Sequence, residues 1–102
     1  MTVLVYTAHI APEHVSAVEA AGRRVFAAVH AARPEGFRYA VARLGDATYV
    51  TLLEIPDGGR NPLRDIPEYT AFEAALPGWL AEPSTGGAGT LIGSYRVFDP
   101  AG

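Results

Sequence analysis

The fold of this chain is decided by residues 37–55, FRYAVARL-GD-ATYVTLLEI. Two runs rich in β-branched and aromatic residues lie on either side of Gly45-Asp46, and such runs are typical of strands. A two-residue connection with glycine first is what a type II′ hairpin turn requires. The turn therefore predicts an antiparallel hairpin in which Leu44 pairs directly with Ala47.

The segments outside the hairpin complete a β-α-β-β-α-β order. Thr2–Ile10 has the composition of a strand, and the valines between Pro12 and Arg33 recur at helical spacing. A second helix is expected from Asp65 to Leu76 and a last strand from Thr90 to Phe98, with the glycine-rich Trp79–Gly89 as a loop. This order is the ferredoxin-like α+β arrangement, for which right-handed crossovers predict the strand order 4-1-3-2.

Capping residues predict where the helices begin and end. The first helix is expected to stop near Arg33, because Pro34 disfavours a helical residue before it and Gly36 can adopt the left-handed conformation. At the start of the second helix, Asp65 is expected to cap while Glu68 reaches back. The buried face of that helix is expected to carry Ile66, Tyr69, Phe72 and Leu76.

Length and composition exclude several classes of protein. A chain of 102 residues suits one domain, spanning residues 1–102, and the lack of cysteine excludes disulfides and thiolate sites. The net charge is −3, and the eight basic residues are scattered arginines, so no nucleic-acid partner is expected. The short apolar opening and the lack of a long apolar run predict a cytoplasmic protein without a membrane span.

Both faces of the predicted sheet are apolar, although two helices cover only one of them. The predicted register places Arg38, Ala40, Ala42, Tyr49, Thr51 and Leu53 on the face toward the helices. The opposite face carries Tyr39, Val41, Val50 and Leu52. A sheet face of about 500 Å² is at the limit of what a monomer leaves exposed. We therefore expect a homodimer with an interface of Leu4, Tyr6, Tyr39, Val41, Val50 and Leu52. The alternative is a monomer in which Arg43, Glu54 and Arg96 keep that face hydrated.

The whole chain resembles the antibiotic biosynthesis monooxygenase type of dimeric α+β barrel. The resemblance lies in Gly36-Phe37, in the Gly45-Asp46 hairpin and in residues 75–80, ALPGWL. It implies a homodimer with a pocket between sheet and helices in each subunit. For some members it also implies oxidation of an aromatic or quinone-like substrate without metal or flavin. Other branches bind or degrade haem, isomerise lactones or have no known activity.

The sequence departs from that family at the positions that would carry its chemistry. Thr51 and Ile55 stand where those oxygenases place an asparagine and a tryptophan, and Thr7 stands where haem-degrading members use an amide. No haem-ligating histidine is found in the second helix. The chemistry of the family therefore does not transfer residue by residue, and no cofactor is expected.

His9 is the first candidate for catalysis, because only histidine titrates near neutrality without help. In register with Thr7, it is expected to point under the helices near Tyr49 and Thr51 and to act as a base. The alternative is a partly exposed residue at a strand end. His14 and His30 are expected on helix surfaces, and no histidine pair has ligand spacing, so no metal is expected.

Polar and aromatic residues supply the remaining candidates for ligand binding. Arg38 is expected to point toward the helices, where a guanidinium must meet an anion, either an internal carboxylate or an acidic ligand. Tyr49, Tyr69 and Trp79 would line a pocket for a planar ligand, or else belong to core or interface. The candidate substrate-binding set is Thr7, Arg38, Tyr49, Thr51, Tyr69 and Trp79.

Two functional hypotheses follow, with a lactone isomerase or a haem-handling relative as a third possibility. The first is a cofactor-free monooxygenase that acts on a small aromatic or polyketide-type molecule. The second is a non-catalytic dimeric module of the same fold that binds a small ligand or a partner. An open cavity with converging polar groups between sheet and helices favours the first hypothesis, whereas a space filled by side chains favours the second.

Overall fold

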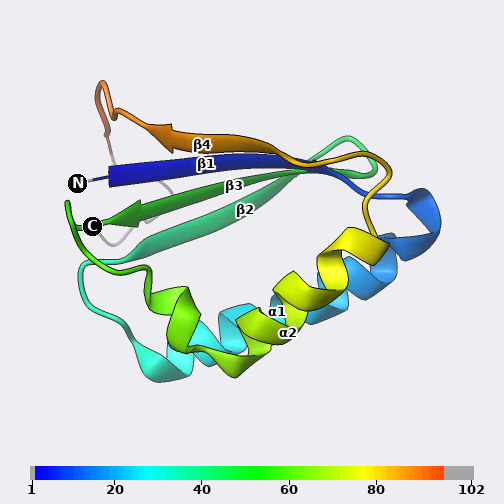
Figure 1. Ribbon diagram of the computed structural model, residues 1–102, viewed down its shortest axis with the longest axis horizontal. Helices are drawn as coiled ribbons and strands as arrows, with labels where there is room; N and C mark the ends of the chain where they lie inside the picture. The colour runs from blue at the N-terminus through cyan, green and yellow to red at the C-terminus, as the bar shows by residue number, and fades with distance from the viewer. Residues whose placement is uncertain (1, 96–102) are drawn as a thin grey trace.

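Four strands form one antiparallel sheet in the computed structural model, which describes residues 2–95 (Figure 1). They are β1 (Thr2–His9), β2 (Arg38–Leu44), β3 (Thr48–Ile55) and β4 (Thr85–Gly89). The strand order is β2-β3-β1-β4, which confirms the predicted order and the ferredoxin-like α+β fold. The strands β2 and β4 are the two edges of the sheet.

Among the described residues, two helices lie together on one face of this sheet, and the other face carries none (Figure 1). The helices are α1 (Val15–Ala32) and α2 (Pro67–Ala75), with short 3₁₀ turns η1 (Pro12–His14), η2 (Pro62–Asp65) and η3 (Leu76–Gly78) at their ends. Within residues 2–95, none of the helices has the length and apolar character needed to cross a membrane.

The connection between β2 and β3 is one residue longer than predicted. Residues 45–47 form the turn, so Leu44 pairs with Thr48 instead of Ala47. Ala47 is bound to the residue after β1 instead, because its carbonyl accepts a hydrogen bond of 2.8 Å from the N–H of Ile10. A slip of one residue reverses which side chains of β2 face the helices, so the predicted faces of β2 are wrong while those of β3 hold.

The first helix ends near Arg33 as predicted, but the residues that cap the helices differ from the prediction. Arg33, not Gly36, closes α1 in the left-handed conformation with φ of 49°, because the following Pro34 prevents the helix from continuing. Asp65 does not cap α2: it ends η2 and pairs with Arg60 at 2.9 Å. The cap of that region is Asn61, whose side chain accepts from the N–H of Leu63.

The last strand begins five residues earlier than predicted, at Thr85 rather than Thr90. Glycine is disfavoured in strands, which is why residues 85–89 resembled a loop. Here glycine is needed, because Gly86 has φ of 144° and a Cβ there would overlap the carbonyl oxygen of Val5. Residues 90–95 form no strand, and residues 96–98 of the predicted strand lie outside the described residues.

The core between sheet and helices consists of two buried clusters. One contains Val25, Leu53, Leu63 and Ile66, and the other contains Ile10, Val18 and Tyr49. Phe72 of α2 packs against both clusters and so connects them. The predicted buried faces of both helices are confirmed by Val18 and Val25 in α1 and by Phe72 in α2.

Candidate functional site

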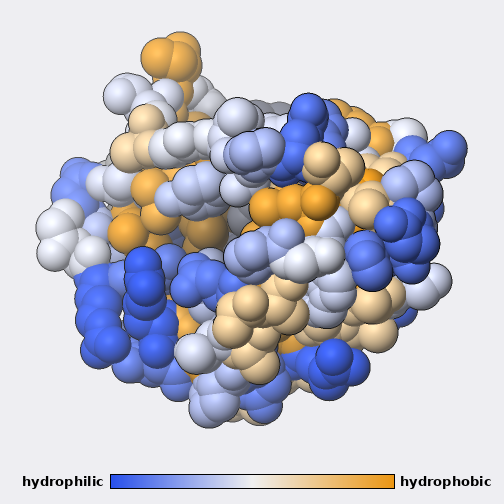
Figure 2. Space-filling view, turned by 45° about the vertical axis from the view of Figure 1, so that its right-hand side comes forward, coloured by the Kyte–Doolittle hydropathy of each residue, from blue (hydrophilic) through white to orange (hydrophobic). Residues whose placement is uncertain are grey.

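A cavity of about 850 Å³ lies between the sheet and the two helices. It lies within the range typical of small-molecule sites, and it is lined by apolar side chains with a few polar groups. The strands contribute nine lining side chains: Leu4, Tyr6, Ala8, Tyr39, Val41, Arg43, Tyr49, Thr51 and Leu53. Figure 2 shows one side of the molecule, where hydrophobic residues lie in a hollow with hydrophilic residues around it.

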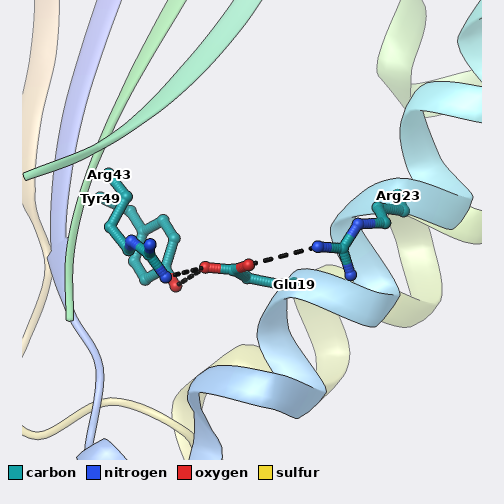
Figure 3. A network of polar contacts seen from close by, with 4 residues as sticks. All are labelled: Glu19, Arg23, Arg43 and Tyr49. Atoms are coloured by element: carbon teal, nitrogen blue, oxygen red, sulfur yellow. Dashed lines mark hydrogen bonds and ion pairs between the residues drawn. The ribbon is translucent and has the colours of Figure 1, made fainter. Parts of the chain in front are cut away.

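Glu19 of α1 reaches across this cavity to the sheet (Figure 3). Its Oε2 accepts a hydrogen bond of 2.7 Å from Tyr49 and another of 2.7 Å from Nη1 of Arg43. Its Oε1 is 3.4 Å from Nη2 of Arg23, one turn further along α1. We refer to Glu19, Arg23, Arg43 and Tyr49 as the Glu19 network.

The Glu19 network holds its carboxylate ionised. The hydrogen bond from Tyr49 and the charges of Arg43 and Arg23 lower the pKa of Glu19 below its ordinary value, against a smaller opposing effect of burial. The same contacts raise the pKa of Arg43, and burial together with the Glu19 carboxylate raises the pKa of Tyr49. One anion, one cation and one phenol donor thus meet at one point of the cavity wall.

A second polar group lies on the wall formed by α2. Tyr69 donates a hydrogen bond of 3.2 Å to Oε2 of Glu73 in the next turn of that helix. Burial and the Glu73 charge raise the pKa of Tyr69 to about 12, and burial raises the pKa of Tyr39 to about 12 as well. Both phenols therefore stay protonated at neutral pH, and the single O–H of Tyr69 is donated to Glu73.

Three of the six predicted substrate-binding residues line the cavity: Tyr49, Thr51 and Tyr69. Arg38 does not, because the slipped register turns it to the face without helices, where its Nε is 4.0 Å from Glu54. Thr7 lies on that same outer face opposite Val50. Trp79 is absent from the cavity lining and packs edge-on against Phe72 with ring centroids 5.9 Å apart.

His9 also lies on the outer face, so its predicted position in the cavity is wrong. It is paired with Thr48, whose Oγ1 is 3.0 Å from Nδ1 of His9. Its Nε2 is 3.3 Å from Glu82 in the segment before β4. The physical reason is the alternation of side chains along β1, because the neighbouring Ala8 packs toward the helices.

The predicted interface residues divide between the two faces. Val50 and Leu52 lie on the outer face as predicted, opposite Ala42 and Ala40 of β2. Leu4, Tyr6, Tyr39 and Val41 line the cavity instead, so their predicted place on the outer face is wrong. Phe26 of α1 stacks on the ring of Tyr39 at 4.5 Å, which fixes that residue on the helix side.

Glu19 and Arg23 were not among the residues singled out in the sequence, and Arg43 was named only as a residue that would hydrate the face without helices, whereas it lines the cavity. Glu19 directly follows Val18 of the buried stripe, and that position on α1 is the available signal that its side chain borders the core. Arg43 can be predicted to line the cavity only when the turn is known to contain three residues. Within residues 2–95, no cluster of three or more histidine, aspartate or glutamate side chains could hold a metal ion.

Comparison with known proteins identifies the fold. No family model and no curated protein matches the chain. Among solved structures, a candidate antibiotic biosynthesis monooxygenase from Caulobacter crescentus has a TM-score of 0.73 at 19% identity, over 90% of each chain. A second candidate of that kind, from Nitrosomonas europaea, has a TM-score of 0.72 at 16% identity, over 89% of each chain.

A third structure is that of SnoaB, a cofactor-independent oxygenase from Streptomyces nogalater, solved as a mutant. Its TM-score is 0.65 at 21% identity, over 91% of this chain and 94% of SnoaB. These likenesses define the class of fold: the chain has the α+β fold of the antibiotic biosynthesis monooxygenase type of structure. The resemblance noted in the sequence is confirmed at that level.

Proposed function

We propose that this protein is an oxygenase that oxidises a small aromatic substrate with O₂ in the cavity between sheet and helices, without a metal or flavin. The observation that carries the proposal is the cavity of about 850 Å³ into which Glu19, Arg43, Tyr49 and Tyr69 converge from two helices and two strands. The fold shared with SnoaB, itself a cofactor-independent oxygenase, supports the choice of reaction.

The proposed substrate carries an activated methylene group between aromatic rings or beside a carbonyl. Loss of one proton gives a carbanion, or its enolate form, which supplies the electrons that reduce O₂. The net change replaces two C–H bonds by a C=O bond, with one oxygen atom entering the product and the other leaving as water. Substrate and O₂ together balance this reaction.

The Glu19 network contains the groups that such a reaction needs. The ionised carboxylate of Glu19 is the candidate proton acceptor. Arg43 and Tyr49 both donate to one point of the cavity, where they would stabilise a negative enolate oxygen. Because the pKa of Glu19 is lowered, this carboxylate is a weak base, which suits a substrate whose proton is already acidic.

The experiment is protein-dependent O₂ uptake with dithranol, a hydroxylated anthrone whose methylene group lies between aromatic rings, after subtraction of autoxidation. Glu19→Gln is expected to lower the rate roughly 100-fold, as removal of a general base does. Its matched control is Glu13→Gln, at an exposed glutamate outside the cavity lining. The proposal fails if dithranol is not consumed faster with the protein than without it, or if both variants keep the full rate.

The alternative, a non-catalytic module that binds a small ligand or a partner, would be favoured by a space filled with side chains. The cavity is open instead: Tyr6 is 40% exposed and Val41 is 38% exposed, although both are on the helix side of the sheet. That openness supports the enzyme. A protein that binds dithranol without accelerating its oxidation would support the module.

We also infer that two copies pair through the outer face of the sheet. No described helix covers that face, and its central side chains are Val5, Val50, Leu52 and Ala40. Burying an apolar face of this kind against a second copy is favourable, since a monomer seldom leaves such a patch in water. The inferred interface replaces the one expected from the sequence, of which only Val50 and Leu52 remain.

A further inference from the structure

We propose that Glu19 occupies an anion-binding subsite formed by Arg43 and Tyr49, and that an acidic oxygen of the ligand replaces it there. The ligand class is an aromatic molecule with one carboxylate, phenolate or enolate oxygen. The inference deepens the proposed function and rests on it for the place where the ligand binds.

The two donors of the subsite are held in place by the sheet. Arg43 and Tyr49 are direct register partners on β2 and β3, so their side chains leave the same face side by side. Tyr49 is buried at 9% exposure and packs with Ile10 and Val18, which limits its movement. Two donors aimed at one point, one of them fixed by packing, form a site for a single negatively charged oxygen.

Glu19, in contrast, belongs to helix α1 and not to the sheet. It reaches the subsite from α1 across the gap between helix and sheet, as Figure 3 shows. A single oxygen, Oε2, makes both 2.7 Å contacts. The carboxylate of Glu19 therefore stands where the acidic oxygen of a ligand would stand, and a glutamate side chain has several rotatable bonds through which it can leave.

Arg23 provides the position to which Glu19 can move. It lies one turn along the same helix, its side chain is 76% exposed, and it already meets Oε1 of Glu19 at 3.4 Å. Such pairs on one helix face are easily formed. Displacement from the subsite would thus leave Glu19 beside a cation instead of unpaired.

The charge balance of the cavity also favours an anion. Its described lining contains three arginines, Arg23, Arg43 and Arg64, but only two glutamates, Glu19 and Glu73. One added negative charge would balance the charges of this lining. A ligand with a net positive charge would instead compete with Arg43 for Glu19.

The test is a fluorescence titration with hydroxynaphthoate and with its amide, a probe of similar shape without the charge. Glu19→Gln is expected to bind hydroxynaphthoate about three- to tenfold more tightly than the wild type, because the competing anion is gone. Arg43→Ala is expected to bind it about tenfold more weakly. The amide should bind all three proteins with similar affinity.

A second variant keeps the test informative if Glu19→Gln folds poorly. Arg23→Ala removes the position to which Glu19 moves, so it should weaken hydroxynaphthoate binding, whereas Arg24→Ala, at the exposed neighbouring arginine, should not. Weaker or unchanged binding to a folded Glu19→Gln variant overturns the inference, and so does a lack of hydroxynaphthoate binding to every variant.

The two proposals can fail independently. If hydroxynaphthoate binds as expected but dithranol is not oxidised, the oxygenase proposal fails and the subsite stands. If dithranol is oxidised but Glu19→Gln does not bind the anion more tightly, the subsite fails and the oxygenase stands. The Glu19→Gln variant is most informative because the two proposals predict opposite changes, slower turnover and tighter binding of the anion.

Discussion

Arg43 and Tyr49 are paired across strands β2 and β3, and both donate to the same carboxylate oxygen of Glu19 at 2.7 Å. This arrangement depends on the length of one turn. With two residues in the turn, Arg43 would lie on the outer face and Tyr49 alone would reach α1. The third residue of the turn, Ala47, therefore sets the register in which Arg43 and Tyr49 lie on the same face of the sheet.

Acid should weaken the folded protein partly through Glu19. Folding lowers the pKa of Glu19 from its ordinary value of 4.5. The ionised carboxylate therefore stabilises the folded protein at pH values above 4.5. This stabilisation is lost as the pH falls through the lowered pKa. Urea unfolding between about pH 5 and pH 3 should show a smaller loss of stability in Glu19→Gln than in the wild type. Equal losses in the two proteins would contradict the prediction.

Replacement of His9 should leave catalysis intact. The side chain lies on the outer face, where it contacts Thr48 and Glu82, so His9→Ala should oxidise dithranol at the wild-type rate. The measurement is O₂ uptake under conditions that give a clear loss for Glu19→Gln. A rate as low as that of Glu19→Gln would restore the hypothesis drawn from the sequence, that His9 is the base.

Gly86→Ala should destabilise the β1–β4 pairing. The backbone of Gly86 has φ of 144°, and a Cβ there would overlap the Val5 carbonyl oxygen and lie 2.8 Å from Cδ1 of Tyr6. A strained backbone of this kind costs about 1–3 kcal/mol, and the overlap adds to it. Gly87→Ala is the matched control, because a Cβ there meets no atom within 4 Å. Urea unfolding compares the two, and equal stability would refute the strain.

Val50→Arg should disrupt the inferred dimer. Val50 lies on the outer face between Thr7 of β1 and Ala42 of β2, where a buried arginine without a counter-ion would be costly. Light scattering should give a dimer mass for the wild type and a monomer mass for this variant. Ser16→Arg, on the exposed side of α1, is the control and should remain a dimer. A wild-type protein that stays monomeric at high concentration would remove the inference altogether.

The order of the elements was accessible from the sequence because it depends on patterns that extend over many residues. The valine stripe of α1 and the two strand-like runs of the hairpin each contain several agreeing signals. Once those elements were placed, the handedness of the crossovers was enough to predict the order β2-β3-β1-β4.

The site was less accessible because it depends on single residues. Ala47 was assigned to the strand instead of the turn, and this error exchanged the two faces of β2. As a result, Arg38 was predicted inside the cavity and Arg43 outside it. The residues of β4 have low strand propensity because they are rich in glycine. Glycine is needed there because the backbone of Gly86 lies close to that of Val5. Glu19 forms its contacts only after α1 has packed on the sheet, and no local pattern encodes that distance.

The members of the Glu19 network come from one continuous part of the chain, α1 through β3, whereas the opposite cavity wall with Tyr69 and Glu73 comes from α2. Consider gene recombination with its junction in the loop after Ile55. It would join the first part of one such protein to the second part of another, and the Glu19 network would be transferred intact. Exchange at that single junction could give chimeras with a new partner wall, so the two halves of the pocket can evolve separately.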